Sequence, residues 1–247
     1  VEEPDDPWSY IGYWGDHQII YLLKMLELSN QFHPQKLSEL LHQPLFCYAN
    51  VPYRIKPIDE LIKDAKSTVN YDQSLANEIE KRVEHIGADG KLVLTKDGQV
   101  YQVNLLEKLI VPLLSKLSNF VLDGGIWLNT QRPEWNDANN ALVGQGLSMV
   151  TLYYMRRYVK FMQSLLASQS EEVALSSEVN QWLVTIADIL SQMVKHLDQN
   201  SLNDELRFKF VSQLGQAGSD YRQTVYANDG FKGKTQLSIT TVNRLLE

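Results

Sequence analysis

The spacing of leucine and isoleucine in the middle of the chain constrains its fold more than any other feature. Apolar side chains there recur every three or four positions, which is the repeat of an α-helix with one buried face. The run comprises Leu105, Leu106, Leu109, Ile110, Leu113, Leu114 and Leu117. Pro112 stands inside it, where proline is expected to kink a helix or to mark its beginning.

The same periodicity recurs along most of the chain, so we expect a largely helical protein. Short connections between helices favour antiparallel helical hairpins, and functional residues then gather on the loops at one end of the array. The expected helices cover 16–29, 37–41 (ended by Pro44), 58–69, 75–86 (closed by Gly87), 105–117, about 138–168, 173–199, 202–214 (ending near Gly215) and a last one from about Thr240.

One segment departs from the helical pattern. In KLVLTKDGQVYQV, residues 91–103, two short runs rich in β-forming residues flank Asp97-Gly98, a strong signal for a hairpin turn. We interpret it as a small surface β-hairpin inserted between helices. The predicted fold class is therefore all-α, with a single domain over residues 1–247.

Charge and cysteine content narrow the functional classes. The net charge of −7 and the absence of a Lys/Arg cluster argue against a nucleic-acid surface. No segment reaches the roughly 18 apolar residues of a membrane span, and VEEPDDPWSY lacks the apolar run of a signal peptide. Cys47 is the single cysteine, which suits a reducing compartment, so we expect a cytoplasmic protein without membrane partners. The five histidines form no metal-binding pair, and we expect no metal.

The stretch RPEWNDANNALVG, residues 132–144, carries the densest chemistry. Two carboxylates, Glu134 and Asp137, flank Trp135, and amides crowd around them. A sugar presents an apolar face to an aromatic ring and a rim of hydroxyls to amides and carboxylates. A carboxylic acid with a raised pKa can also protonate a glycosidic oxygen. An alternative remains open, in which Asp137 simply caps a helix that begins at Ala138.

The order of residues in this stretch resembles the motif D-W-N-D-G-M-N-x-V-G of glycoside hydrolase family 94, the inverting cellobiose and chitobiose phosphorylases. Glu134 replaces the first Asp of the motif and Ala138 replaces its Gly. The resemblance implies that Asp137 is the general acid and that Trp135 lines the donor-sugar subsite. The positions that match in identity and spacing are Trp135, Asn136, Asp137, Asn140, Val143 and Gly144.

A second stretch, YIGYWGDHQIIYLL at 10–23, resembles the R-D-x-x-Q segment of the same family. Asp16 matches the Asp that holds sugar hydroxyls, whereas Gly15 stands where the family has Arg. Trp14 joins Asp16 as a candidate substrate contact. The family's catalytic domain is an (α/α)6 toroid of six helical hairpins. The resemblance thus implies a toroid-like array, and twelve helices need more chain than this, so we expect a segment of a longer polypeptide.

These observations define one candidate site and two uses for it. Asp137 and Glu134 are the candidate catalytic residues, and a protein of this class cleaves a disaccharide or oligosaccharide with inversion. The candidate substrate contacts are Trp135, Asn136, Asp16, Arg132, Asn140 and Trp14.

No cofactor is expected, although inorganic phosphate is a candidate co-substrate that Arg132, His17 or Arg54 would hold. Hydrolysis would instead need a base, for which Asp16, Asp123 and Glu134 are candidates. The alternative is a non-catalytic sugar-binding or structural domain beside other domains of a parent chain.

Overall fold

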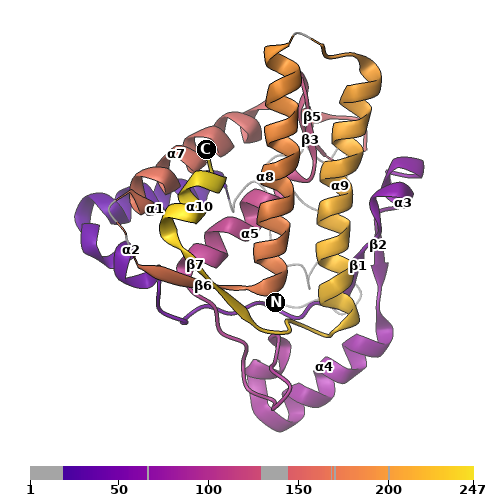
Figure 1. Ribbon diagram of the computed structural model, residues 1–247. Coiled ribbons are helices and arrows are strands. Elements are labelled where there is room, and N and C mark those ends of the chain that lie inside the picture. Colours follow the sequence, from indigo (N-terminus) through magenta and orange to yellow (C-terminus); the bar gives the residue numbers. More distant parts are fainter. Residues whose placement is uncertain (1–18, 66, 129–143, 168, 170, 200) are drawn as a thin grey trace.

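The computed structural model describes residues 19–65, 67–128, 144–167, 169, 171–199 and 201–247. These residues form a mostly helical structure with small antiparallel sheets at its edges (Figure 1). The helices are α1 (Ile20–Phe32), α2 (Pro34–Leu40), α3 (Ile58–Lys63), α4 (Gln73–Ile86), the 3-10 helix η2 (Gly87–Lys91), α5 (Leu105–Leu117), α7 (Met149–Leu166), α8 (Ser177–Asp198), α9 (Asp204–Ala227) and α10 (Ile239–Leu245).

Three small sheets join segments that the helices separate. β1 (Tyr53–Ile55) pairs with β2 (Val69–Tyr71), and β3 (Phe120–Val121), β4 (Gly125–Trp127) and β5 (Leu147–Ser148) form a three-stranded ribbon. β6 (Glu172–Ser176) pairs with β7 (Lys234–Ser238) in antiparallel register. The expected all-α class is therefore correct for most of the described chain but omits these sheets.

Helix α5 lies at the centre of the hydrophobic core. Its apolar side chains are buried on several sides, and the side chain of Asn104 caps the helix by accepting a hydrogen bond from the Glu107 N–H at 3.0 Å. Pro112 does not interrupt the helix, which continues to Leu117. The fully or nearly fully buried residues of α5 are Leu105, Leu106, Leu109, Ile110, Leu113 and Leu114.

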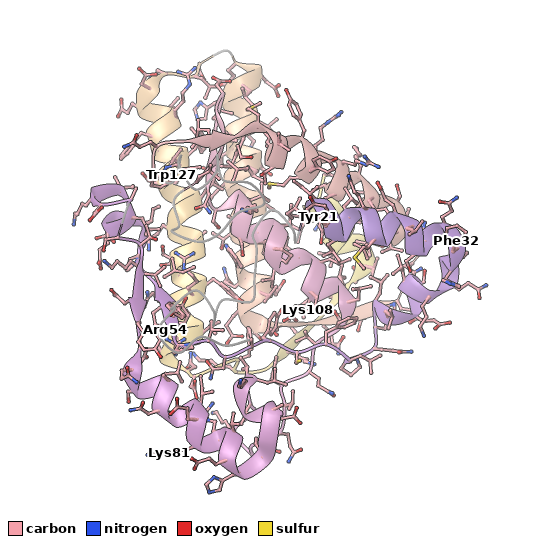
Figure 2. All side chains as sticks on the ribbon, turned by 180° about the vertical axis from the view of Figure 1, so that it is seen from behind. Tyr21, Phe32, Arg54, Lys81, Lys108 and Trp127 are labelled. Carbon is pink, nitrogen blue, oxygen red and sulfur yellow. The ribbon has the colours of Figure 1, made fainter. Side chains whose placement is uncertain are left out.

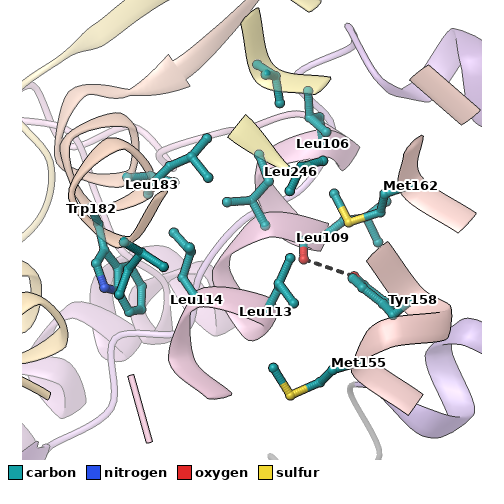
Figure 3. Close-up of a cluster of buried hydrophobic side chains, with 14 of the residues drawn as sticks. Leu106, Leu109, Leu113, Leu114, Met155, Tyr158, Met162, Trp182, Leu183 and Leu246 are labelled. Carbon is teal, nitrogen blue, oxygen red and sulfur yellow. Dashed lines mark hydrogen bonds between the residues drawn. The ribbon is translucent and has the colours of Figure 1, made fainter. Parts of the chain in front are cut away.

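Helix α7 packs against α5 through a buried tyrosine. The hydroxyl of Tyr158, a side chain with no exposed surface, donates to the carbonyl oxygen of Leu109 at 2.9 Å (Figure 3). Because the phenol has no water around it, burial raises its pKa far above the ordinary value. Met155 and Met162 flank it on the same helix face and are buried too. This hydrogen bond joins α7 to α5 inside the core.

The longest helices, α8 and α9, form an antiparallel hairpin (Figure 1). The expectation that the second helix ends near Gly215 is wrong, because α9 continues to Ala227. Gly215 allows α9 to pack closely against α3, because a Cβ at this position would lie 2.5 Å from Ile58 Cγ1. A Cβ on Gly218, one turn later, would lie 2.6 Å from Ser118 Oγ.

The hairpin near 91–103 is confirmed. Leu94 and Val100 form an antiparallel bridge around the Asp97-Gly98 turn, where Gly98 has a φ of +78°. The hairpin is not an isolated surface feature, since Phe46 also bridges Val103 and Ala49 bridges Leu92. Helix α4 beside it ends as expected at Gly87, whose φ is +71°.

Two expected helices have different limits in the structure. Helix α3 stops at Lys63, and Val69 instead begins strand β2, where it pairs with Ile55. Helix α7 begins at Met149 rather than near 138, after strand β5, and Ser148 caps it by accepting from the Thr151 N–H at 3.2 Å. Within the described chain, no helix has both the length and the apolar character needed to cross a bilayer.

Candidate functional site

All eight residues assigned to the site from the sequence lie outside the described residues. Trp14 and Asp16 fall within 1–18, and the other six fall within 129–143. Their roles therefore stay predictions. The six are Arg132, Glu134, Trp135, Asn136, Asp137 and Asn140.

The described residues on either side of 129–143 lie against each other. Strands β4 and β5 pair with Ile126 opposite Ser148, and the Gly144 N–H donates to the Leu128 carbonyl oxygen. The indole N–H of Trp127 adds a bond to the Gly144 carbonyl at 3.3 Å. The chain consequently enters and leaves the motif segment at one place, the end of a small sheet (Trp127 is labelled in Figure 2).

Gly144, the last residue of the motif, has a structural reason to be glycine. Its φ is +85°, which side chains rarely adopt, and a Cβ would lie 3.0 Å from the Cβ of Ala65 and 3.2 Å from its carbonyl oxygen. The residues after it, 145–148, are turn and strand, and the N-cap of α7 is Ser148. Helix α7 therefore begins after the motif, and the alternative in which Asp137 caps a helix beginning at Ala138 lies outside the described residues.

Two other sequence candidates have structural partners of their own. Arg54 stacks over the ring of Tyr226, 4.4 Å from its centroid, and lies 3.6 Å from an oxygen of Asp72. Asp123 has a φ of +61° in the β3–β4 turn, and its carboxylate accepts from Arg207 at 2.9 and 3.2 Å. Arg54 thus ties strand β1 to Tyr226 of α9, and Asp123 forms a surface ion pair.

A buried carboxylate that the sequence reasoning missed lies at the start of α5. Glu107 has no exposed surface, and its oxygens accept from the Tyr48 hydroxyl at 2.9 Å and from the N–H and hydroxyl of Ser176, both at 2.7 Å. Burial raises the pKa of Glu107, and these hydrogen bonds oppose the rise. The available signal was an acidic residue three positions after Asn104, within an apolar run.

The neighbours of Glu107 form a closed network. Ser176 Oγ lies 3.0 Å from the Tyr101 hydroxyl, and burial raises the pKa of Tyr101 to about 12. Burial and the Glu107 carboxylate raise the pKa of Tyr48 well above 10. The Lys108 ammonium sits 4.2 Å from the centre of the Tyr48 ring and donates to the Cys47 carbonyl at 2.9 Å (Figure 2). Since each Glu107 oxygen has a donor and neither meets solvent, we interpret the network as structural rather than catalytic.

A cleft between α8 and α9 lies beside this network. Its volume is about 320 Å³, which falls at the lower end of the range for small-molecule pockets. The Glu178 side chain at the start of α8 lines it, with one oxygen accepting from the Lys232 N–H at 3.1 Å. Trp182 lies one turn further on and stacks against Tyr221 of α9, with ring centroids 4.2 Å apart and planes 14° from parallel. The apolar periodicity of the sequence predicted both helices. It did not predict the cleft, because the residues of its two walls are far apart in the sequence.

A larger hollow, about 570 Å³, separates the 95–98 turn from the 228–232 turn. It brings three cationic side chains, Arg82, Lys96 and Lys232, near Asp229. Arg82 is already engaged, donating to Asp229 at 2.8 Å and to Glu78. This hollow therefore has a basic lining, in contrast to the acidic cleft between α8 and α9.

Within the described chain, no three His, Cys, Asp or Glu side chains are grouped so that they could hold a metal ion. Comparison of the sequence with models of known protein families gave no match, and neither did comparison with curated proteins.

Proposed function

We propose that this chain forms part of a carbohydrate-active protein that cleaves a glycosidic bond with inversion, by phosphorolysis or hydrolysis. The observation that carries the proposal is the order of residues in EWNDANNALVG, where an acid, an aromatic ring and amides stand together. The requirement for glycine at 144 supports it, because the motif's last position is constrained by backbone conformation and by contact with Ala65.

In the proposed reaction Asp137 donates its proton to the glycosidic oxygen as the bond to the anomeric carbon breaks. The nucleophile bonds to that carbon from the opposite face, which inverts its configuration. In hydrolysis the nucleophile is water, and Glu134 or Asp16 takes its proton. In phosphorolysis a phosphate oxygen forms the new bond, with Arg132 assisting. Trp135 and Trp14 would contact the sugar faces, and Asn136, Asn140 and Asp16 its hydroxyls.

We also propose a fold class, binding partners and a cellular compartment for this chain. Antiparallel packing of α8 and α9 supports an (α/α) toroid-like array of hairpins. For partners we propose the oligosaccharide and other domains of a parent polypeptide. An apolar stripe on α1 supports the second partner, since its residues recur on one helix face and are 43 to 69 % exposed (Figure 2): Tyr21, Met25, Leu28 and Phe32. The single cysteine supports the cytoplasm as the compartment.

A non-catalytic sugar-binding domain is the second candidate. One observation favours it: Gly15 stands where the resembling family carries Arg, which removes a cation beside Asp16. In this case the pocket around Trp135 would bind sugar without cleaving it.

The test is a turnover assay of the full chain with cellobiose and N,N'-diacetylchitobiose, with and without inorganic phosphate. Product configuration at the anomeric carbon is read by NMR. We expect Asp137→Asn to lower turnover by at least about 100-fold, the usual contribution of a general acid. Asp188→Asn, which removes an exposed carboxylate of α8, is the matched control and should leave turnover unchanged.

Each result of this assay decides between the candidates. Phosphate-dependent turnover identifies a phosphorylase, and phosphate-independent turnover a hydrolase. Sugar binding that Trp135→Ala abolishes, without any turnover, identifies the binding domain. A chain with neither turnover nor sugar binding contradicts both candidates.

A further inference from the structure

The cleft between α8 and α9 contains two polar atoms that have no hydrogen-bond partner among the described residues. Glu178 is 8 % exposed and Trp182 is 3 % exposed, and both line the cleft. The second carboxylate oxygen of Glu178 and the indole N–H of Trp182 are buried without a hydrogen bond. Buried polar atoms are nearly always paired, so two unpaired atoms in one cleft indicate a missing partner.

The two groups face the same side of α8. Glu178 and Trp182 are four residues apart, which places them one above the other on a helix. Glu178 is held by its other oxygen, which accepts from the Lys232 N–H at 3.1 Å, and Trp182 is held by stacking on Tyr221. Both side chains are thus held in place at the cleft, and their unpaired atoms have almost no accessible surface, so a hydroxyl reaches them when a neighbouring side chain shifts.

The chemistry of the pair selects a hydroxyl group. A hydroxyl oxygen can accept from the indole N–H while its proton is donated to the carboxylate. An ammonium group only donates, and a phosphate or carboxylate only accepts. An anion would also meet the negative charges of Glu178 and Asp220, and the described residues that line this cleft include no lysine or arginine.

The remaining walls suit a ligand with several hydroxyls. The aromatic side chains of Trp182 and Tyr221 give an apolar surface, and Gln181, Thr185 and Asp220 give a polar rim. This combination matches the apolar face and hydroxyl rim of a sugar ring. A water molecule at these atoms would use neither the aromatic surface nor the rim.

We propose that the cleft between α8 and α9 is a binding site for a neutral monosaccharide or a terminal sugar unit. Glu178 accepts from a sugar hydroxyl and Trp182 donates to it. The described side chains that line this site all come from α8 and α9, so its residues differ from those of the motif at 132–144. It would hold a sugar whether or not the motif is catalytic.

The test follows the indole N–H signals of the ¹⁵N-labelled full chain by NMR during titration with methyl α- and β-glucoside, galactoside and mannoside. The chain has five tryptophans, and Trp182→Phe identifies the Trp182 signal by its disappearance. We expect at least one glycoside to shift that signal with millimolar affinity. Trp182→Phe keeps the ring and loses the N–H, and Glu178→Gln keeps the shape and loses the acceptor. Each should weaken binding about tenfold, as followed by calorimetry.

Matched controls separate this site from the motif and from folding defects. Trp135→Phe changes a motif residue and should leave the Trp182 shift intact, and thermal melts show whether each variant is folded. If either cleft variant fails to fold, the wild-type titration decides, with the Trp182 signal assigned by replacing the other four tryptophans in turn.

Three outcomes would overturn the proposal. The Trp182 signal could stay unmoved by all neutral glycosides at about 0.1 M, far above a millimolar dissociation constant, which would mean that the cleft holds water. Glucosamine could bind more tightly than the glucosides, which would show selection for a cation. Sugar binding could survive Trp182→Phe and vanish in Trp135→Phe, which would place the sugar only at the motif.

Discussion

Glu107 shows how much a single buried group can matter in this protein. Its carboxylate has no exposed surface and holds Tyr48 and Ser176, which belong to segments far apart in the sequence. Both hydroxyl partners can donate or accept, so a glutamine in place of Glu107 can reverse those bonds and still accept from the Ser176 N–H. The charge, rather than the shape, is what distinguishes the two side chains.

The raised pKa of Glu107 predicts a pH dependence of stability. The folded state binds the proton more tightly than the unfolded state, whose carboxyl titrates near 4.5. The stabilisation is therefore present below about pH 4.5 and is lost as pH rises through the folded-state pKa. Relative to Glu107→Gln, we expect the wild type to lose unfolding free energy over that range.

Urea unfolding at a series of pH values measures this difference. Glu84→Gln, at an exposed position on α4, is the control and should run parallel to the wild type. If the wild type and Glu107→Gln also run parallel, the carboxylate titrates normally and the prediction fails.

At the scale of elements, the glycines of α9 decide how closely the hairpin packs. Gly215→Ala would place a methyl group 2.5 Å from Ile58 Cγ1, so α3 must move or Ile58 must change rotamer. We expect a loss of about 1–3 kcal/mol in unfolding free energy, the usual cost of overpacking. Gly233→Ala is the matched control, because a Cβ there meets nothing within 4 Å. Chemical denaturation compares the two, and equal stability of both variants would contradict the packing role.

Gly215 also shows why some helix ends cannot be predicted from the sequence. Apolar periodicity locates α1, α4, α5 and α8 well, because a buried helix face is a local pattern. Gly215 looks like a helix end, yet its role depends on Ile58, which lies far away in the sequence. Strands β6 and β7 were missed for a related reason, since each is short and stabilised by pairing with a distant segment. The α8–α9 cleft and the Glu107 network could not be predicted either, because they bring together residues that are far apart in the sequence. The motif at 132–144 could be recognised because its residues are consecutive.

At the scale of the whole molecule, the last helix closes the core. Ile239 and Val242 of α10 have no exposed surface and belong to the same hydrophobic cluster as α1, α5, α7 and α8. Val242→Ala should therefore lower the unfolding free energy by about 1–3 kcal/mol. Val194→Ala on α8, where the valine is 51 % exposed, should change it by less than about 0.5 kcal/mol. Guanidinium unfolding monitored by circular dichroism makes the comparison, and equal losses would show that α10 packs only loosely.

The pairing of β6 with β7 also sets an order of assembly during synthesis. Both α8 and α9 lie between the two strands in the chain, so β6 must wait for the whole hairpin to be translated before it can pair. The Lys232 N–H that holds Glu178 emerges at the same late stage. If synthesis paused within α9, the nascent chain would already contain α5 and α7 of the core. It would contain only α8 of the two helices that form the cleft. Ligand binding at that cleft can begin only after α9 and the 228–232 turn have been synthesised.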